Sequence, residues 1–145
     1  MTVQRLLFAL FAVFFALAFS GENARAQSDE PIHIIINNSL SITSTTLAEV
    51  KRVFRKEATA ISGVRVVPIN APRTKPLRAA FVQRAYGTSV QDELATWEKL
   101  KITNGLQPPT EIDNTLKAVF SVKNGISYCF QSDYKPGTAK IILTF

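Results

Sequence analysis

The chain has 145 residues and a formal net charge of +6, and 46% of its residues are hydrophobic. These values are typical of one small globular domain and leave no room for two independent cores. Only one Cys and one His are present, which excludes an intrachain disulfide framework, a cysteine-based zinc site and a two-histidine metal site. We therefore expect no metal and no cofactor, and most covalent enzyme chemistries are excluded as well.

The most hydrophobic segment indicates export. Residues 6–19 are almost unbroken Leu, Phe, Ala and Val, and Arg5 precedes them. This run is shorter than the roughly 20 residues of a membrane-spanning helix. The small-x-small pattern Ala24-Arg25-Ala26 that follows is the kind that signal peptidase reads. The sequence therefore predicts a signal peptide at residues 1–26, a periplasmic domain at residues 27–145 and no stable membrane span after cleavage. The alternative is an uncleaved N-terminal anchor with the same domain outside the membrane.

The predicted domain opens with a strand, a helix and a second strand. Residues 32–36 are a β-branched run typical of a strand that has apolar surroundings on both faces. Thr46 and Glu49 have the spacing of a capping box, which predicts a helix that begins here and ends between residues 59 and 63. Residues 64–69 are the second predicted strand. This order suits a right-handed parallel crossover.

Three further amphipathic helices and two strands are predicted after this opening. The second helix covers residues 77–85, the third begins at Ser89, and the fourth begins at a capping pattern in residues 110–113. Residues 126–130 and 141–145 are the last two predicted strands. The fold class is therefore α/β, a three-layer sandwich in which helices flank a mainly parallel sheet.

Three single residues are candidates for function, and each is better interpreted as structural. Trp97 has the helical spacing of a core residue and is predicted to be buried against the sheet, with stacking on a ligand as the alternative. Cys129 lies in an apolar run and is predicted to be a buried hydrophobe, with an intermolecular disulfide as the alternative. His33 lies inside the first strand and is given no catalytic role.

A basic loop before the second helix is the candidate binding site. It contains Arg73, Thr74 and Lys75, and Arg78 follows in the first turn of the helix. With Thr74 as the N-cap, the helix would direct free backbone N–H groups and its positive dipole end at this loop, which suits an anion. The alternative is an ordinary capped helix with exposed basic residues.

The first helix carries a second group of cations. These are Lys51, Arg52, Arg55 and Lys56. They could attract an anionic partner, although such clusters are more often solvated helix surfaces.

Several motifs occur in a characteristic order along the chain. They are Leu47-Ala48-Glu49-Val50-Lys51-Arg52-Val53-Phe54, Val66-Val67-Pro68-Ile69-Asn70, Arg78-Ala79-Ala80-Phe81, Trp97, Asn104-Gly105-Leu106-Gln107-Pro108-Pro109 and Asn124-Gly125-Ile126-Ser127-Tyr128. Together they resemble small exported proteins related to the phosphate-binding proteins of ABC transporters, with motifs such as L-x-x-I-F, G-x-x-x-P-P and G-A-I-G-Y. The resemblance covers residues 34–145 and implies one lobe of a type II periplasmic binding protein.

The resemblance also implies a place for a ligand. In full-length phosphate-binding proteins, a loop with Ser or Thr and Arg before a helix helps to hold the oxyanion, and Arg73-Thr74-Lys75 falls at the corresponding place. A single lobe cannot close a clamp around a solute, however, so the resemblance implies the fold more directly than it implies solute capture.

Two functions follow as hypotheses. The first is an exported, noncatalytic module that binds phosphate or another oxyanion at Arg73, Thr74, Lys75 and Arg78. The alternative is a cell-envelope accessory or protein-interaction domain that has lost solute binding and meets a protein partner through the basic first helix or an apolar sheet edge. A homodimer that rebuilds a two-sided cleft is a further option. Nucleic-acid binding is a poor option because export removes the target and no recognition motif accompanies the charge. An enzyme is a poorer option still.

Overall fold

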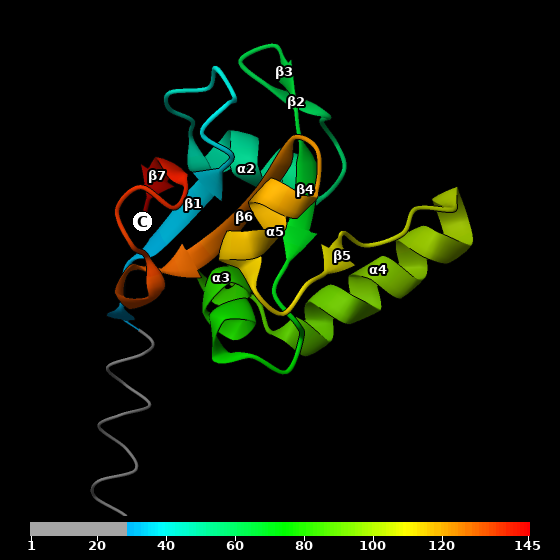
Figure 1. The fold of residues 1–145 in the computed structure, drawn as a ribbon. Coiled ribbons are helices and arrows are strands. Elements are labelled where there is room, and N and C mark those ends of the chain that lie inside the picture. The colour runs from blue at the N-terminus through cyan, green and yellow to red at the C-terminus, as the bar shows by residue number, and fades with distance from the viewer. Residues whose placement is uncertain (1–28) are drawn as a thin grey trace, which may run out of the picture. The chain divides into compact units, whose positions relative to one another are not determined.

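A five-stranded sheet organises residues 29–145, the part of the chain that the computed structural model describes (Figure 1). The strand order is β5-β4-β6-β1-β7, with β1 at Ile32–Ile36, β4 at Val67–Asn70, β5 at Thr110–Glu111, β6 at Gly125–Phe130 and β7 at Lys140–Thr144. Strand β1 is antiparallel to both β6 and β7, whereas β4 is parallel to β5 and β6. Every strand except β1 therefore points the same way. The predicted signal peptide, residues 1–26, lies outside the described residues.

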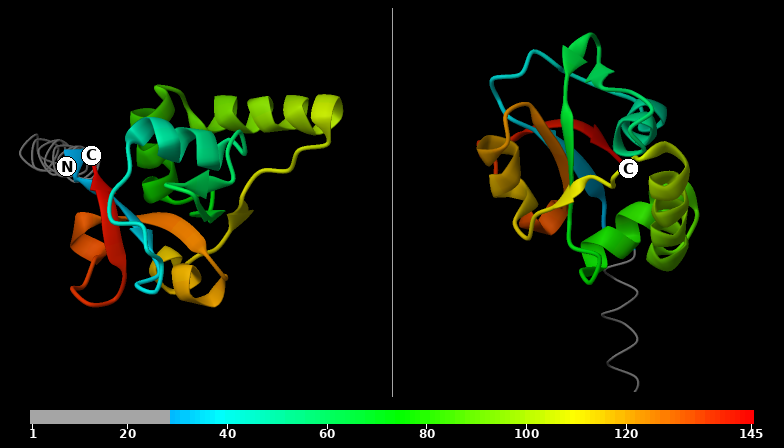
Figure 2. Two further views of the ribbon diagram at one scale, coloured as in Figure 1. Left: turned by 90° about the horizontal axis from the view of Figure 1, so that it is seen from above. Right: turned by 90° about the vertical axis from the view of Figure 1, so that its right-hand side faces the viewer.

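Helices cover both faces of this sheet. They are α2 at Leu47–Phe54, α3 at Pro76–Tyr86, α4 at Val90–Asn104 and α5 at Thr115–Ser121. Side chains of β1 alternate between two cores: Ile34 packs in the cluster that includes Phe54 of α2 and Phe81 of α3, and Ile35 packs with Val119 of α5. The two views in Figure 2 show α2 and α3 on the face of the sheet opposite to α5. The predicted three-layer α/β architecture is confirmed, and the burial of all five residues of β1 follows from it.

The connection between the first strand and the second differs from the prediction. Strand β6 lies between β1 and β4, and β1 runs opposite to β4, so the predicted parallel crossover is wrong. Residues 64–69 also do not form one strand, because Val64–Arg65 (β3) pairs with Ala60–Ile61 (β2) in a separate hairpin. Helix α2 ends at Phe54, before the predicted region, where Lys56 adopts a left-handed backbone with φ of 59°.

Local capping signals predicted two of the four helix starts, those of α2 and α4. Thr46 and Glu49 form the capping box of α2, and the Ser89 hydroxyl accepts a hydrogen bond from the backbone N–H of Asp92 at the start of α4. The capping pattern at residues 110–113 is wrong, because this segment is extended and Asn114 caps α5 instead. No helix among residues 29–145 is long and apolar enough to span a membrane.

The three single residues have mainly structural positions. Cys129 is buried in the core beneath α5, and the His33 ring contacts Thr144 through a hydrogen bond of 2.8 Å at Nδ1. The prediction that Cys129 is a buried hydrophobe is confirmed, and the hydrogen bond of His33 agrees with a structural position. Trp97 is also buried, with 5% of its surface exposed, but it lines a pocket bounded by α2 and α4 and belongs to neither core cluster of the sheet. Its burial is confirmed, but the expected packing against the sheet is not, because α3 is the element that α4 contacts most.

Candidate functional site

The basic loop joins β4 to α3, and a proline determines where the helix begins. Pro76 occupies the first turn of α3, and a residue that precedes proline is restricted to extended backbone. Lys75 has φ of −88° and ψ of 141°, which makes it the N-cap, and its side chain makes no capping hydrogen bond. The prediction that Thr74 caps the helix is therefore wrong. Thr74 lies one residue further out and is exposed.

The start of α3 offers few free backbone donors to an anion. Pro76 has no N–H group. The N–H of Arg78 donates to the carbonyl oxygen of Lys75 at 3.0 Å, and the N–H of Ala79 donates to the same oxygen at 3.4 Å. The N–H of Lys75 in turn donates to the carbonyl oxygen of Pro72 at 3.0 Å. The loop is closed by its own hydrogen bonds, so most of the predicted donors are in use.

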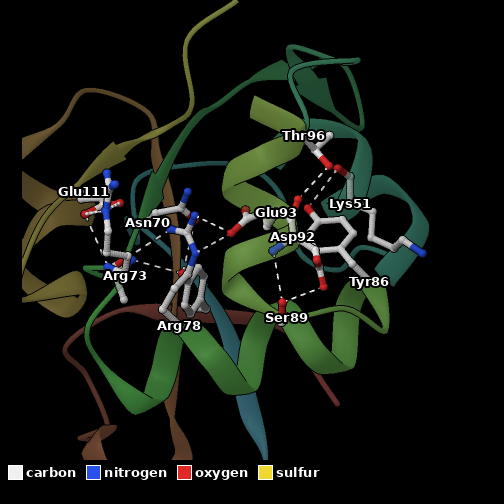
Figure 3. A network of polar contacts seen from close by, with 12 residues as sticks. Lys51, Asn70, Arg73, Arg78, Tyr86, Ser89, Asp92, Glu93, Thr96 and Glu111 are labelled. Atoms are coloured by element: carbon white, nitrogen blue, oxygen red, sulfur yellow. Dashed lines mark hydrogen bonds and ion pairs between the residues drawn. The ribbon is translucent and has the colours of Figure 1, made fainter. Parts of the chain in front are cut away.

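Each of the three predicted cations forms an ion pair with a carboxylate of the chain. Arg73 Nε lies 3.1 Å from Glu111 Oε1, Lys75 Nζ lies 3.2 Å from Asp113 Oδ1, and Arg78 Nη2 lies 2.8 Å from Glu93 Oε2. Figure 3 shows Arg73 directed toward Glu111 and Arg78 directed toward Glu93 on α4, on separate sides of the loop. The positive charge of the predicted site is balanced in this structure.

Arg78 is the most deeply buried of these cations. Its side chain is 1% exposed, and besides the pair with Glu93 its Nη1 donates to the carbonyl oxygen of Ala71 at 3.2 Å. The Tyr128 hydroxyl completes the network, because it accepts from the N–H of Ala71 at 3.1 Å and donates to Asn70 Oδ1 at 3.2 Å. This network fixes the segment that leaves β4.

The pKa values agree with fixed protonation states in this network. Burial by itself would lower the pKa of Arg78, but Tyr128 and Glu93 beside it raise the pKa above the ordinary value for arginine. Burial raises the pKa of Tyr128 well above its ordinary value, so its hydroxyl stays protonated. Neither group titrates near neutral pH.

The acidic partners were not predicted. The capping pattern of residues 110–113 predicts a helix start at Glu111 and Asp113, whereas the structure places Glu111 in β5, opposite Asn70 at the end of β4. On an extended chain, side chains two residues apart point to the same side. The Glu-x-Asp spacing of Glu111 and Asp113 was therefore the one signal that both carboxylates could face the loop together. No comparable signal marks Glu93, which reaches Arg78 from the next helix.

The basic surface of α2 differs from the loop; it consists of Lys51 and Arg52 in the helix and Arg55 and Lys56 just after its end. Among residues 29–145, none of these four cations forms an ion pair with a carboxylate. Arg55 lies 4.5 Å from the centre of the Tyr86 ring, and Lys51 lies 5.8 Å from it. The cations without an ion pair are therefore those of the basic surface of α2.

The described residues contain no sign of a metal centre. No group of three His, Cys, Asp or Glu side chains within residues 29–145 could hold a metal ion.

No protein-family model and no curated protein matches the sequence. Solved structures are similar in fold. A putative phosphate ABC transporter substrate-binding protein with bound phosphate from Clostridium perfringens matches 78% of this chain with a TM-score of 0.57 and 17% identity. An ABC-type phosphate transport receptor from Vibrio cholerae matches 78% with a TM-score of 0.59 and 11% identity. A possible phosphate binding protein from Planctomyces limnophilus matches 78% with a TM-score of 0.52 and 11% identity.

The match covers less than half of each of these proteins. The chain spans 44%, 45% and 40% of their lengths, respectively. The resemblance expected from the sequence motifs is confirmed at the level of fold. The chain has the fold of phosphate ABC transporter substrate-binding proteins, and it matches less than half of the length of each.

Proposed function

We propose that this chain is an exported, noncatalytic accessory domain that contacts a protein partner in the cell envelope through the basic surface of α2. One observation carries the proposal: within the described residues 29–145, the cations of the predicted oxyanion loop are all paired with carboxylates, and those of the basic surface of α2 are not. Export rests on the apolar segment 6–19 and the cleavage pattern after it.

Charge argues against phosphate capture as the main role. An oxyanion at the loop would lie beside Glu111 and Asp113, and like charges at close range repel one another. The exposed loop is also open to water, where salt screens the charge of a bound anion.

The surface of α2 has the properties of a contact for an acidic partner. Arg52 and Lys56 are exposed, and the capping box holds the helix in place at its N-terminus. Unpaired cations on a rigid helix can meet acidic side chains without first breaking ion pairs of their own. Such complementarity increases the rate and the specificity of association.

Photocrosslinking in cells that express the full chain tests this proposal. A photoreactive residue at Ala48, one helical turn before Arg52 on the exposed side of α2, leaves all four cations intact. We expect a discrete protein adduct that disappears when Lys51→Glu and Arg52→Glu are combined, because the charge of the contact is reversed.

The matched control reverses the same number of charges in the loop, with Arg73→Glu and Lys75→Glu. This variant should keep the adduct. Absence of any adduct, or an adduct that only the loop variant removes, would reject contact through α2.

Weak oxyanion binding at the loop is the second candidate. The side chains of Arg73 and Lys75 are 54% and 51% exposed, and exposed ion pairs contribute only about 0 to 1 kcal/mol, so an anion can compete with Glu111 and Asp113. In this candidate Arg73, Thr74 and Lys75 contact the anion, and Arg78 adds positive charge from beneath the loop.

Isothermal titration with phosphate and sulfate at low ionic strength tests the second candidate. We expect a dissociation constant on the order of 1 mM or weaker for the natural sequence. The combined Glu111→Gln and Asp113→Asn changes should tighten binding at least about fivefold, because each removes a competing carboxylate without altering side-chain shape. Arg73→Ala in that background should abolish the gain. No heat from either protein would exclude the loop as an oxyanion site.

A further inference from the structure

A pocket of about 440 Å³ opens at the C-terminal end of α3, between the end of α2 and helix α4. Its apolar walls come from separate elements and include Phe54, Tyr86, Trp97, Leu100 and Leu106. The volume is within the range of small-molecule sites, which are mostly apolar and have a few placed polar groups.

Four charged residues border this pocket: Arg55, Lys56, Glu57 and Glu93. Glu93 is committed to Arg78, which it binds at 2.8 and 3.0 Å. Neither Arg55 nor Lys56 has an ion pair among residues 29–145, and Glu57 has none there either. Two unpaired cations thus oppose one unpaired carboxylate, so the rim has an excess of about one positive charge, which suits a ligand with a single negative group.

Lys56, on the rim of the pocket, has a strained backbone. Its φ of 59° is in the left-handed region, which is unfavourable for a residue other than glycine. Two hydrogen bonds hold this turn: the N–H of Lys56 donates to the carbonyl oxygen of Val53 at 3.0 Å, and the N–H of Glu57 donates to that of Arg52 at 2.8 Å. Glycine would adopt the conformation freely, so a lysine here costs stability.

The guanidinium group of Arg55 lies over the aromatic ring of Tyr86. Its guanidinium carbon lies 4.5 Å from the centre of the Tyr86 ring, which is itself part of the pocket wall. A guanidinium held over a ring keeps its N–H donors available at the edge, so a carboxylate can bind there without displacing an existing ion pair.

From this arrangement we infer that the pocket binds an amphipathic anion, a molecule with an apolar chain or ring and one carboxylate. The apolar part lies against Trp97, Phe54 and Leu100, and the carboxylate meets Arg55 and Lys56 at the rim. A small inorganic anion would leave the apolar walls in contact with water, and a neutral hydrocarbon would leave the two cations without a partner. This inference shares Arg55 and Lys56 with the protein contact proposed for the basic surface of α2, but the charge reversal that tests that contact changes Lys51 and Arg52, which do not line the pocket.

Fluorescence of Trp97 reports directly on the pocket, because it is the only tryptophan in the chain. Protein purified from cells that express the full chain is titrated with decanoate, decanol and decyltrimethylammonium, each below the concentration at which it forms micelles. We expect a saturable change with decanoate and a dissociation constant on the order of 10 to 100 µM. Decanol should bind at least about tenfold more weakly, and the cation should not bind.

Two charge variants and a matched control test the role of the rim. Arg55→Gln and Lys56→Gly should each weaken decanoate binding at least about fivefold and leave the weak response to decanol unchanged. Lys56→Gly should also unfold at a higher urea concentration than the natural sequence, because it relieves the left-handed backbone, so loss of binding cannot be attributed to misfolding. Lys101→Gln removes one positive charge from an exposed residue of α4 that does not line the pocket and should bind decanoate normally.

Several results would overturn the inference. Equal affinity for decanoate and decanol would show a purely apolar site, and a response that rises without saturation would show nonspecific partitioning. Equal weakening by Lys101→Gln would show that net charge alone, and not the rim, attracts the anion. Failure of decanoate to bind leaves the crosslinking test of α2 unaffected, so the two proposals fail independently.

Discussion

Replacing Phe81 with Ala should lower the free energy of unfolding by about 3 to 5 kcal/mol, the range for truncation of a buried phenylalanine. Phe81 is 1% exposed and lies on α3 against the sheet. Its ring stacks on the ring of Tyr128 in β6 with centroids 3.9 Å apart, and the Phe54 ring of α2 lies 5.1 Å away. The substitution would leave a cavity where three elements meet, and the surrounding side chains can fill it only in part.

Phe120→Ala is the matched control, because it is the same chemical change at a residue that is 47% exposed. It should cost less than about 1 kcal/mol, since little surface is transferred from water on folding. Urea unfolding followed by circular dichroism measures both values. A similar cost for the two variants would mean that Phe81 does not hold the layers together.

Signals confined to one turn of the chain predicted where α2 and α4 begin. The capping box of Thr46 and Glu49 and the cap at Ser89 are made by residues three apart, so the sequence contains both partners side by side. The β-branched run 32–36 likewise predicted a strand buried on both faces, because its composition reflects its surroundings directly.

Pairing between distant strands could not be predicted in this way. Strand β1 pairs with β6 and β7, whose residues lie near the other end of the chain, and nothing within residues 32–36 specifies the direction of a neighbour. The order of strand, helix and strand instead suggested a parallel crossover. Strand direction in this sheet depends on which strands pair with the two edges of β1, and that is a property of the whole fold.

The candidate site shows the same division between local and distant information. The basic residues of the loop are adjacent in sequence and were found, but their partners are not adjacent. Glu111 lies 38 positions from Arg73, and Glu93 lies 15 positions from Arg78. When the partners are not known, a cluster of cations predicts positive charge that is available to an anion. In the structure, the same cations form ion pairs that connect the loop to β5 and α4.

The pair Arg78 and Glu93 provides the second large expected effect. Glu93→Gln should destabilise the fold by about 3 kcal/mol, near the lower end of the range for a broken buried pair, because Glu93 is 13% exposed and Arg78 only 1%. The guanidinium would keep its hydrogen bond to Ala71 but lose the carboxylate that receives both Nε and Nη2. Water cannot easily replace it at such burial.

A double-mutant cycle separates this interaction from the loss of packing. Arg78→Met removes the buried charge, and Arg78→Met combined with Glu93→Gln should then cost less than the two single changes added together, by about 1 to 3 kcal/mol. The exposed pair of Lys75 and Asp113, tested with Lys75→Met and Asp113→Asn, should show a coupling below about 1 kcal/mol. Additive single effects at Arg78 and Glu93 would contradict a structural pair. A strong coupling would mean that Arg78 connects α4 to the segment that follows β4. It would also mean that the charge of Arg78 is paired with Glu93 and is not available to an anion at the loop.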